Sequence, residues 1–440
     1  MIARARSAEA FALLSVTLLW VALHVGCANV SAPGRPALDR EAEEYARLVV
    51  ALGERDPDSL DDFYGPSSWR ADAQSRQTSL TDIRHSAEAL RDRLSNTRFT
   101  ERAQERRREF LTRQLGALMA RIDLLDGARW PFAEESRRLF DIDIPPANVK
   151  GMEAVRASID RLLPGPGELR ARYAAFDRRF LIPPGRVPAV LARAFDECRR
   201  VTREHVELPA DERVDLTYVH DSPWSAFTRY LGGYRSRIDV NVDFALTPDR
   251  ALQLACHEGY PGHHVMGVLV EDGLVRRGRV ELTAQPLFSP RALLAEGTAS
   301  FAPELAFPEA ARVQVERDAL FPLAGLDAGE AERYVRVAVL VDRLHAVELD
   351  VARRYLDGEL EFARAAAVLE HDALMPSADA TLKFLNEYRS FAVTYTRGRD
   401  MAAAAVETRS DSSADAAARW RAYLDLIASP DQAFPPPPQK

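Results

Sequence analysis

The stretch HEGYPGHH, residues 257–264, gathers three histidines and one glutamate within eight positions. Histidine nitrogens are common zinc ligands, and a glutamate beside a ligand is well placed to act as a general base. The whole chain contains nine histidines, so three of them beside a glutamate are an improbable chance cluster. The stretch therefore predicts a metal site.

Pro261 decides which histidines can share one ion. In a straight helix His257 and His263 would differ by about 240° of rotation, and His264 would lie about 10 Å further along the axis than His257. Both arrangements separate the imidazoles too widely for one zinc ion with ligands at about 2.0–2.1 Å. Pro261 lacks an N–H and clashes with the carbonyl of residue 257, so the helix must break or bulge there. If two residues loop out, with Gly262 supplying backbone freedom, His263 replaces the fourth-residue histidine of the usual H-E-x-x-H helix. We expect His257 and His263 as ligands, with His264 as second choice for the latter.

A third ligand must come from another segment. Glu296, in the apolar stretch LLAEGTAS, is the best candidate, because a carboxylate there is costly unless it binds something. Glu258 lies beside His257, where a general base for a metal-activated water belongs. Glu304 is either an orienting residue or part of a solvated helix face. The expected cofactor is one Zn²⁺ ion.

Helical patterns surround these residues. From residue 38 to about 206 they include 79–96, with Ser79 as a cap, 101–125 and 187–206. The arginine run 106–108 is expected to be a solvated helix face.

The pattern changes near residue 214. Residues 214–219 and 234–243 alternate apolar and polar side chains and predict strands, with a loop between them. Thr247 is expected to cap the helix that leads to His257, and further helices are expected over 293–307, 328–356 and 382–407.

The N-terminus predicts export. Two early arginines, an apolar run and small residues ending at Cys27 indicate a signal over residues 1–27, followed by a linker over 28–37. Gly-Cys at its end is similar to a bacterial lipobox, which predicts membrane attachment through lipidated Cys27, whereas the competing interpretation is an ordinary cleaved signal. We expect a periplasmic or outer-membrane lipoprotein of the cell envelope. Cys198 and Cys256 then remain, either paired or as two buried thiols.

The composition and net charge limit the classes of molecule that this protein is expected to bind. The 440 residues are 47% hydrophobic and 28% charged, which is typical of a globular protein, and the net charge of −8 disfavours nucleic acid as a partner. We expect one domain over residues 38–430, with an N-terminal lobe over 38–206 and a metal-site lobe over 207–430. A disordered Pro-rich tail is expected over residues 431–440.

The chain contains, in this order, the motifs DSPWSAFTRYLGGYRSRIDVNVD, ACHEGYPGHH, AEGTAS and YRSFAVTYTRG. With these motifs the chain resembles, across about residues 40 to 425, the bacterial family known as domain of unknown function 885. The family has an H-E-x-x-P-G-H-H signature and is similar to helical, glutamate-liganded zinc metallopeptidases (gluzincins). Thr298 stands where much of the family has a tryptophan. The resemblance implies a mainly α fold, with two helical lobes flanking a deep cleft and a small sheet beside the metal-binding helix.

The resemblance also implies further site residues. In such peptidases a strand beside the metal helix pairs with the substrate, and Tyr234 with the residues that follow it is placed for this role. A tyrosine opposite the metal donates to the oxyanion, for which Tyr395 and Tyr388 are the candidates. Arg389 or Arg235 would bind a substrate carboxylate.

These expectations together favour an exported zinc metallopeptidase that acts on a peptide or small protein. One alternative is a non-haem iron enzyme that uses two histidines and a carboxylate. The other is a surface-anchored lipoprotein that binds without catalysis.

Overall fold

The computed structural model describes residues 38–145, 151–222, 224–376, 378–410, 415–431 and 434. The predicted signal, lipidation site and linker lie outside these residues. From residue 38 onward, the described residues form one compact unit. Among the described helices, none is long and apolar enough to cross a membrane.

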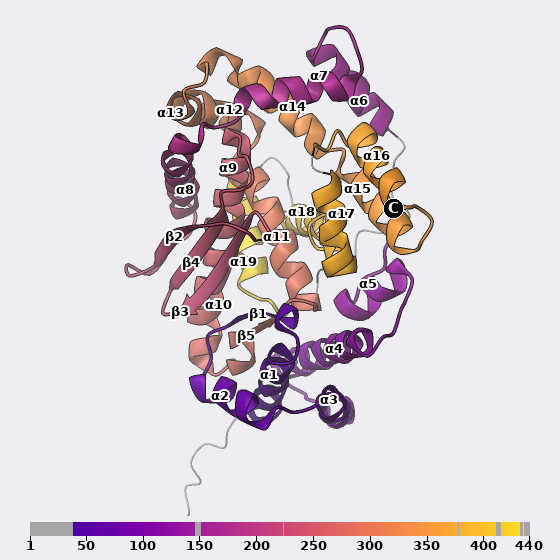
Figure 1. Cartoon of the computed structure of the whole chain (residues 1–440). Coiled ribbons are helices and arrows are strands. Elements are labelled where there is room, and N and C mark those ends of the chain that lie inside the picture. The colour runs from indigo at the N-terminus through magenta and orange to yellow at the C-terminus, as the bar shows by residue number, and fades with distance from the viewer. Residues whose placement is uncertain are drawn as a thin grey trace, which may run out of the picture. The chain divides into compact units, whose positions relative to one another are not determined.

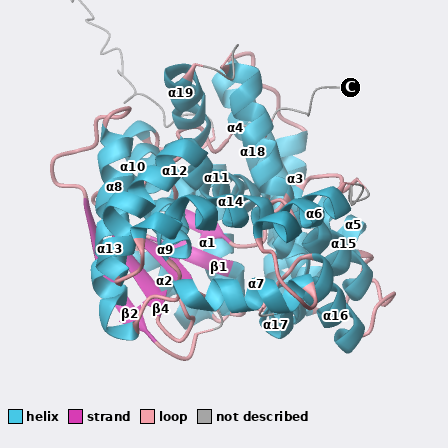
Figure 2. Ribbon diagram, turned by 90° about the horizontal axis from the view of Figure 1, so that it is seen from above, coloured by secondary structure: helices cyan, strands magenta, loops and turns pink. Residues whose placement is uncertain are grey.

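Helices dominate the structure, which confirms the expectation of a mainly α fold (Figures 1 and 2). The first eight are α1 (Asp39–Gly53), α2 (Ser67–Arg76), α3 (Leu80–Ser95), α4 (Arg102–Leu125), α5 (Phe132–Phe140), α6 (Met152–Leu162), α7 (Leu169–Asp177) and α8 (Val187–Arg203). The next six are α9 (Pro248–Leu254), α10 (His263–Gly273), α11 (Pro290–Ala306), α12 (Glu309–Val315), α13 (Phe321–Ala324) and α14 (Ala331–Asp342). The last five are α15 (His345–Leu356), α16 (Phe362–Asp372), α17 (Ala378–Tyr388), α18 (Arg397–Arg409) and α19 (Ala416–Ile427).

Local sequence signals set several of these helix ends. The Ser79 side chain accepts a hydrogen bond from the backbone N–H of Asp82 and begins α3. The Thr247 side chain accepts one from the N–H of Arg250 and begins α9. Both capping predictions are confirmed, because a cap needs only residues within one turn of itself.

Two small sheets accompany the helices. Strands β1 (Leu60–Phe63) and β5 (Ala284–Pro286) pair antiparallel. The second sheet has the order β2-β4-β3, from β2 (Arg213–Val219), β3 (Ala226–Gly232) and β4 (Arg235–Asn241). β4 runs parallel to β2 and antiparallel to β3.

The sheet corrects two expectations. The segment before residue 234 is not only a loop, because its residues 226–232 form β3, whose Phe, Thr and Tyr side chains suit a strand. β4 lies in the centre of the sheet, so the strand that follows Tyr234 is no edge on which a substrate could pair. Among the described strands of this sheet, the edges are β2 and β3.

Two long helices predicted from periodicity are broken. The segment 328–356 divides into α14 and α15, with a break at residues 343–344. The segment 382–407 divides at Arg389, whose backbone is left-handed (φ 52°), and a 3₁₀ turn follows before α18. Periodicity alone could not show these breaks, because the apolar pattern continues through them.

The expectation that the arginine run 106–108 in α4 is a solvated helix face is wrong. Arg107 and Arg108 are buried, and Arg107 forms ion pairs with Glu281 at 2.9 Å and with Asp39 at 2.7 Å. Glu281 lies 174 positions away, so the local pattern contains no sign of this pairing.

The hydrophobic side chains form two clusters. One joins α1, α3 and α4 to α8, the β2-β4-β3 sheet, the segment around His257, and α18 and α19. The other joins α5 to α7 with α14 to α17. α11 contributes to both clusters. The predicted boundary near residue 206 does not coincide with the boundary between these clusters.

Candidate metal centre

The chain changes helical form where it carries the first histidine. α9 passes into a π-helical turn, Ala255–Gly259, closed by a hydrogen bond from the N–H of Tyr260 to the carbonyl of Ala255. Tyr260 is extended, and α10 begins at His263. The intervening residues therefore interrupt the helix at Pro261, where the ring cannot continue it.

Position 262 has no room for a side chain, so it requires a glycine. A Cβ at this position would lie 1.9 Å from the carbonyl oxygen of His257 and 2.6 Å from that of Cys256. Its φ of −73° is not left-handed, so the close approach of two chain segments explains the glycine. The Gly262 N–H donates to the Cys256 carbonyl at 3.0 Å, which holds the looped segment against the π turn.

This turn brings the expected ligands together. The Nε2 atoms of His257 and His263 lie 3.1 Å apart. Glu296, on α11, places Oε2 3.3 Å from the Nε2 of His257 and Oε1 3.5 Å from that of His263. Two ligands at about 2.0–2.1 Å from a tetrahedral zinc ion are separated by about 3.3 Å. The three side chains therefore have the spacing of a shared ion.

The charges of the group also fit a cation. Glu296 is only 8% exposed, and its Oε2 has no hydrogen-bond donor among the described residues. Burial alone would raise the pKa of Glu296, but the imidazoles of His263 and His257 outweigh it and lower that pKa to about 2. The carboxylate therefore stays ionised and has an acceptor atom left for an ion.

Glu258 lies beside this group without joining it. Its Oε2 accepts a hydrogen bond from the Oγ1 of Thr228 on β3 at 2.7 Å, and the same hydroxyl lies 3.0 Å from the Glu258 carbonyl. The Glu258 charge raises the pKa of both His263 and Tyr395. Thr228 of β3 thus holds the Glu258 carboxylate within electrostatic reach of His263.

His264 lies on the opposite side of the turn. It is fully buried, with Nδ1 2.8 Å from Ser236 Oγ and Nε2 3.0 Å from Glu212 Oε2. Burial lowers the pKa of His264, so the neutral ring accepts from Ser236 and donates to Glu212. Its two nitrogens are occupied, which leaves His263 as the ligand that the geometry supports.

Glu212 organises this second face of the turn, and the sequence did not reveal it. Its carboxylate accepts from Tyr260, His264, Arg199 and Arg203. Burial would raise the pKa of Glu212, but these donors lower it to about 2. The four donors come from two separate segments, so no local pattern could have marked this glutamate.

Of the two candidate tyrosines, Tyr395 lies closer to the ligands. Its ring centroid is 6.2 Å from that of His257, and its side chain is partly exposed. Burial, Glu296 and Glu258 together raise the pKa of Tyr395, which keeps its hydroxyl protonated and able to donate. Tyr388 packs on Phe384 with ring centroids 4.8 Å apart, and burial raises its pKa too.

Two glycines bring Tyr395 to this place. A Cβ on Gly297 would lie 2.5 Å from the backbone of Gly398, so α11 and α18 cross where neither has a side chain. Gly297 follows Glu296 directly, and Gly398 is the last residue of the YTRG motif. Gly398 therefore allows the close contact between α11 and α18, and this contact brings Tyr395 near Glu296.

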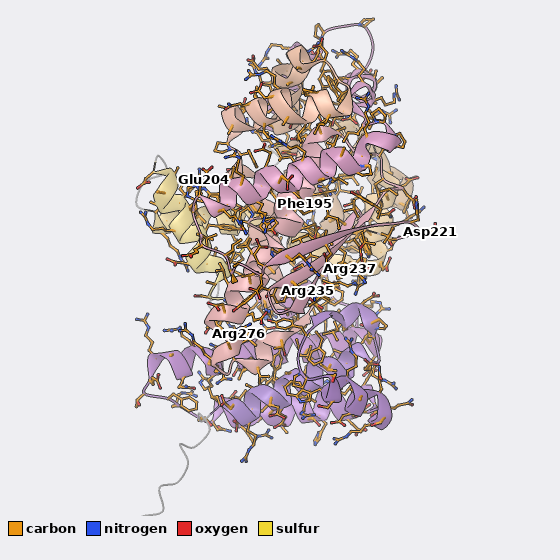
Figure 3. The ribbon with its side chains drawn as sticks, turned by 90° about the vertical axis from the view of Figure 1, so that its left-hand side faces the viewer. Phe195, Glu204, Asp221, Arg235, Arg237 and Arg276 are labelled. Carbon is orange, nitrogen blue, oxygen red and sulfur yellow. A yellow bond between two sulfur atoms is a disulfide. The ribbon has the colours of Figure 1, made fainter. Side chains whose placement is uncertain are left out.

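Three predicted substrate-binding residues lie elsewhere. Arg389 pairs with buried Glu135 at 2.7 Å and holds the break between α17 and α18. Arg235 faces outward from β4, near Asp215 at 3.7 Å (Figure 3). Tyr234 donates to Asp272 at 2.7 Å in the left-handed turn between β3 and β4. Each of these three side chains is engaged in local structure, and their substrate-binding roles stay predictions.

Sequence reasoning also missed Asp61 on β1. Its Oδ2 accepts from the amide of Gln285 at 2.9 Å. Burial, Glu296 and Asp62 raise the pKa of Asp61 to about 7, which shows that it shares the electrostatic surroundings of the ligand group. Gln285 and Glu296 are more than 200 positions away in the sequence, so the local pattern around Asp61 did not mark it.

A disulfide anchors the metal turn. Cys198 on α8 and Cys256 form the bond, with Cα atoms 5.5 Å apart. Cys256 directly precedes His257, so the covalent link fixes the start of the π turn to α8. Of the two states expected for these cysteines, the structure has the paired one.

In comparisons with known proteins, no protein-family model and no curated protein matches the chain.

Proposed function

We propose that this protein is an exported zinc-dependent peptidase. The observation that carries the proposal is the group of His257, His263 and Glu296, whose ligand atoms all lie within 4.8 Å of one another. Two imidazoles and one carboxylate are the protein ligands of many catalytic zinc sites, which keep one position open. Export is supported by the sequence of residues 1–27 alone.

The side chains around the group have complementary tasks. A zinc ion, when bound, supplies a Lewis acid for the scissile carbonyl and lowers the pKa of a water molecule. Glu258 accepts a proton from the attacking water and delivers it to the leaving amine as the C–N bond breaks. Tyr395 donates its phenolic hydrogen to the developing oxyanion, a role that its raised pKa supports.

The edge strand β3 is the place for an extended substrate. Its residue Thr228 holds the Glu258 carboxylate, so a peptide paired with this edge passes the general base. Asp62 already accepts from the N–H of Tyr230, which occupies the far end of the edge. Among the described residues of β3, those near Ala226 and Thr228 are therefore the ones available for pairing with a substrate.

Two other interpretations are distinguished by measurement. Two histidines and one carboxylate also hold iron in oxygenases, and metal analysis of protein purified without added metal separates iron from zinc. A protein that binds without catalysis has no need of Glu258 as a base. The hydrogen bond from Thr228 that aims this carboxylate favours the peptidase.

Glu258→Gln tests the proposal. Glutamine keeps the size and the hydrogen bond from Thr228 but cannot accept a proton, so hydrolysis should fall by about 10²–10⁴-fold with zinc content unchanged. The measurement is cleavage of a peptide library, with zinc content and thermal melting determined on the same samples.

Glu304→Gln is the matched control. Glu304 lies on the same helix as Glu296 but pairs with Arg399 at 3.2 Å on the surface, and its loss should leave hydrolysis unchanged. A Glu258→Gln protein that holds zinc and cleaves within a few-fold of the wild type contradicts the mechanism. Wild-type protein with bound zinc that cleaves no peptide contradicts the function.

A further inference from the structure

Arg250 is the cation that lies nearest to Glu258 along the metal-bearing helix. It belongs to the first turn of α9, seven residues before His257 and eight before Glu258, so about two helical turns separate it from them. The charges of Glu258, Asp342, Asp249 and Tyr395 act on its guanidinium, and that of Glu258 acts most strongly. The side chain is exposed to solvent.

This guanidinium has no carboxylate of its own. It donates to two neutral oxygens, Ser225 Oγ at 3.1 Å and Gln253 Oε1 at 3.3 Å, and no ion pair links it to any described residue. The adjacent Asp249 is engaged by Arg312 and by Gln253. Arg250 therefore keeps donor capacity, in contrast with Arg389, which is held by Glu135.

The stretch from Ser225, just before β3, to Thr228 within it relates the position of Arg250 to that of Glu258. Ser225, which contacts Arg250, and Thr228, which contacts Glu258, are three positions apart. The Asn241 N–H donates to the Ser225 carbonyl, so the pairing with β4 extends to this residue. Three extended residues span about 10 Å, and a peptide lying along the edge advances by the same amount per residue.

We propose that Arg250 binds the free C-terminal carboxylate of the substrate, so that the enzyme releases a fragment of two or three residues from the C-terminus of a peptide. Planar guanidinium and carboxylate groups form paired, charge-assisted hydrogen bonds. Hydrolysis breaks the amide C–N bond, and water contributes OH to the new carboxyl group and a proton to the released amine. This proposal rests on the proposed peptidase function.

Paired peptides that differ only in a C-terminal carboxylate or amide test the proposal. Wild type should cleave the free acid with a kcat/KM about 10- to 100-fold higher, near the C-terminus. Arg250→Gln should remove this preference mainly through KM, and Arg250→Lys should restore part of it. Arg213→Gln is the control, because Arg213 is an exposed arginine of β2 that lies 3.2 Å from Asp215.

A binding measurement separates this proposal from the proposed function. In a Glu258→Gln background, calorimetry should show tighter binding of the free-acid peptide than of the amide, with the difference abolished by Arg250→Gln. Equal cleavage of acid and amide by the wild type overturns the role of Arg250 and leaves the peptidase standing. Absence of cleavage with a preserved acid preference in binding overturns the peptidase and leaves the carboxylate site standing. Equal binding of acid and amide overturns the site.

Discussion

Two adjacent histidines have opposite surroundings. His263 faces His257 and Glu296, and although burial alone would lower its pKa, the carboxylate of Glu296 raises it to about 9. His264 is enclosed between Ser236 and Glu212, and burial lowers its pKa. Neighbours in sequence thus differ in role because successive residues at the start of α10 point in different directions.

Metal binding should separate these two histidines. His257→Ala, His263→Ala and Glu296→Gln should each remove most bound zinc, because each takes one of three ligands. His264→Ala should retain the metal while lowering the melting temperature, since it leaves buried Glu212 with a missing donor, at a cost of about 1–3 kcal/mol. Metal analysis and thermal melting of the four variants make the comparison. Greater zinc loss from His264→Ala than from His263→Ala would show that the ligand assignment is wrong.

At the scale of elements, the metal turn depends on close backbone contacts. The π turn, the extended Tyr260 and the start of α10 bring His257 and His263 together, and Tyr423 on α19 donates toward the carbonyl oxygens of Pro261 and Thr298 at 3.2 and 3.3 Å. α10 packs against β3 and β4, and α8 packs against the π turn. The turn is therefore held from three sides.

Gly262→Ala should disrupt this turn. The added Cβ would fall 1.9 Å from a backbone carbonyl oxygen, so the two segments must separate, at a cost of several kcal/mol and with loss of zinc affinity. Gly273→Ala, at the other end of α10, is the control, because an added Cβ there meets nothing within 4 Å. Denaturant unfolding and zinc titration provide the readouts. Equal stability and affinity in the two variants would contradict the steric account.

At the scale of the whole molecule, one covalent bond joins distant parts of the chain. Cys198 and Cys256 are separated by 58 positions, and the bond connects α8 to the metal turn. A crosslink over a loop of this length stabilises the folded state by about 4 kcal/mol, chiefly through the entropy of the unfolded chain. Such a bond persists in oxidising compartments, which agrees with the proposed export.

Removal of this bond should therefore lower both stability and metal affinity. Cys198→Ser leaves Cys256 and its neighbour His257 in place but frees the start of the π turn. We expect a lower melting temperature and weaker zinc binding than in the wild type, and the same shift when the wild type is reduced. If reductant leaves melting unchanged and native protein titrates two free thiols, the structural role of the bond is refuted.

The sequence alone determined the features that depend on near neighbours. Ser79 and Thr247 cap helices with donors three residues away. Pro261 and Gly262 indicated an interruption of the helix, because a missing N–H and a missing Cβ act within one turn. Histidine and glutamate types at this spacing were enough to nominate His257 and His263, since the metal chemistry belongs to the side chains themselves.

Tertiary structure decided what depends on distant partners. Arg389 and Arg235 looked available for substrate, but Glu135, 254 positions from Arg389, and Asp215 lie beside them. β4 carries the clearest strand pattern, yet strand order places it in the centre and leaves β3 at the edge. Arg250 forms no ion pair with any described residue, and its neighbour Asp249 is paired with Arg312, which lies 63 positions away. The contacts between distant chain segments decide which charged side chains keep free donors or acceptors. The local sequence around each residue does not show these contacts.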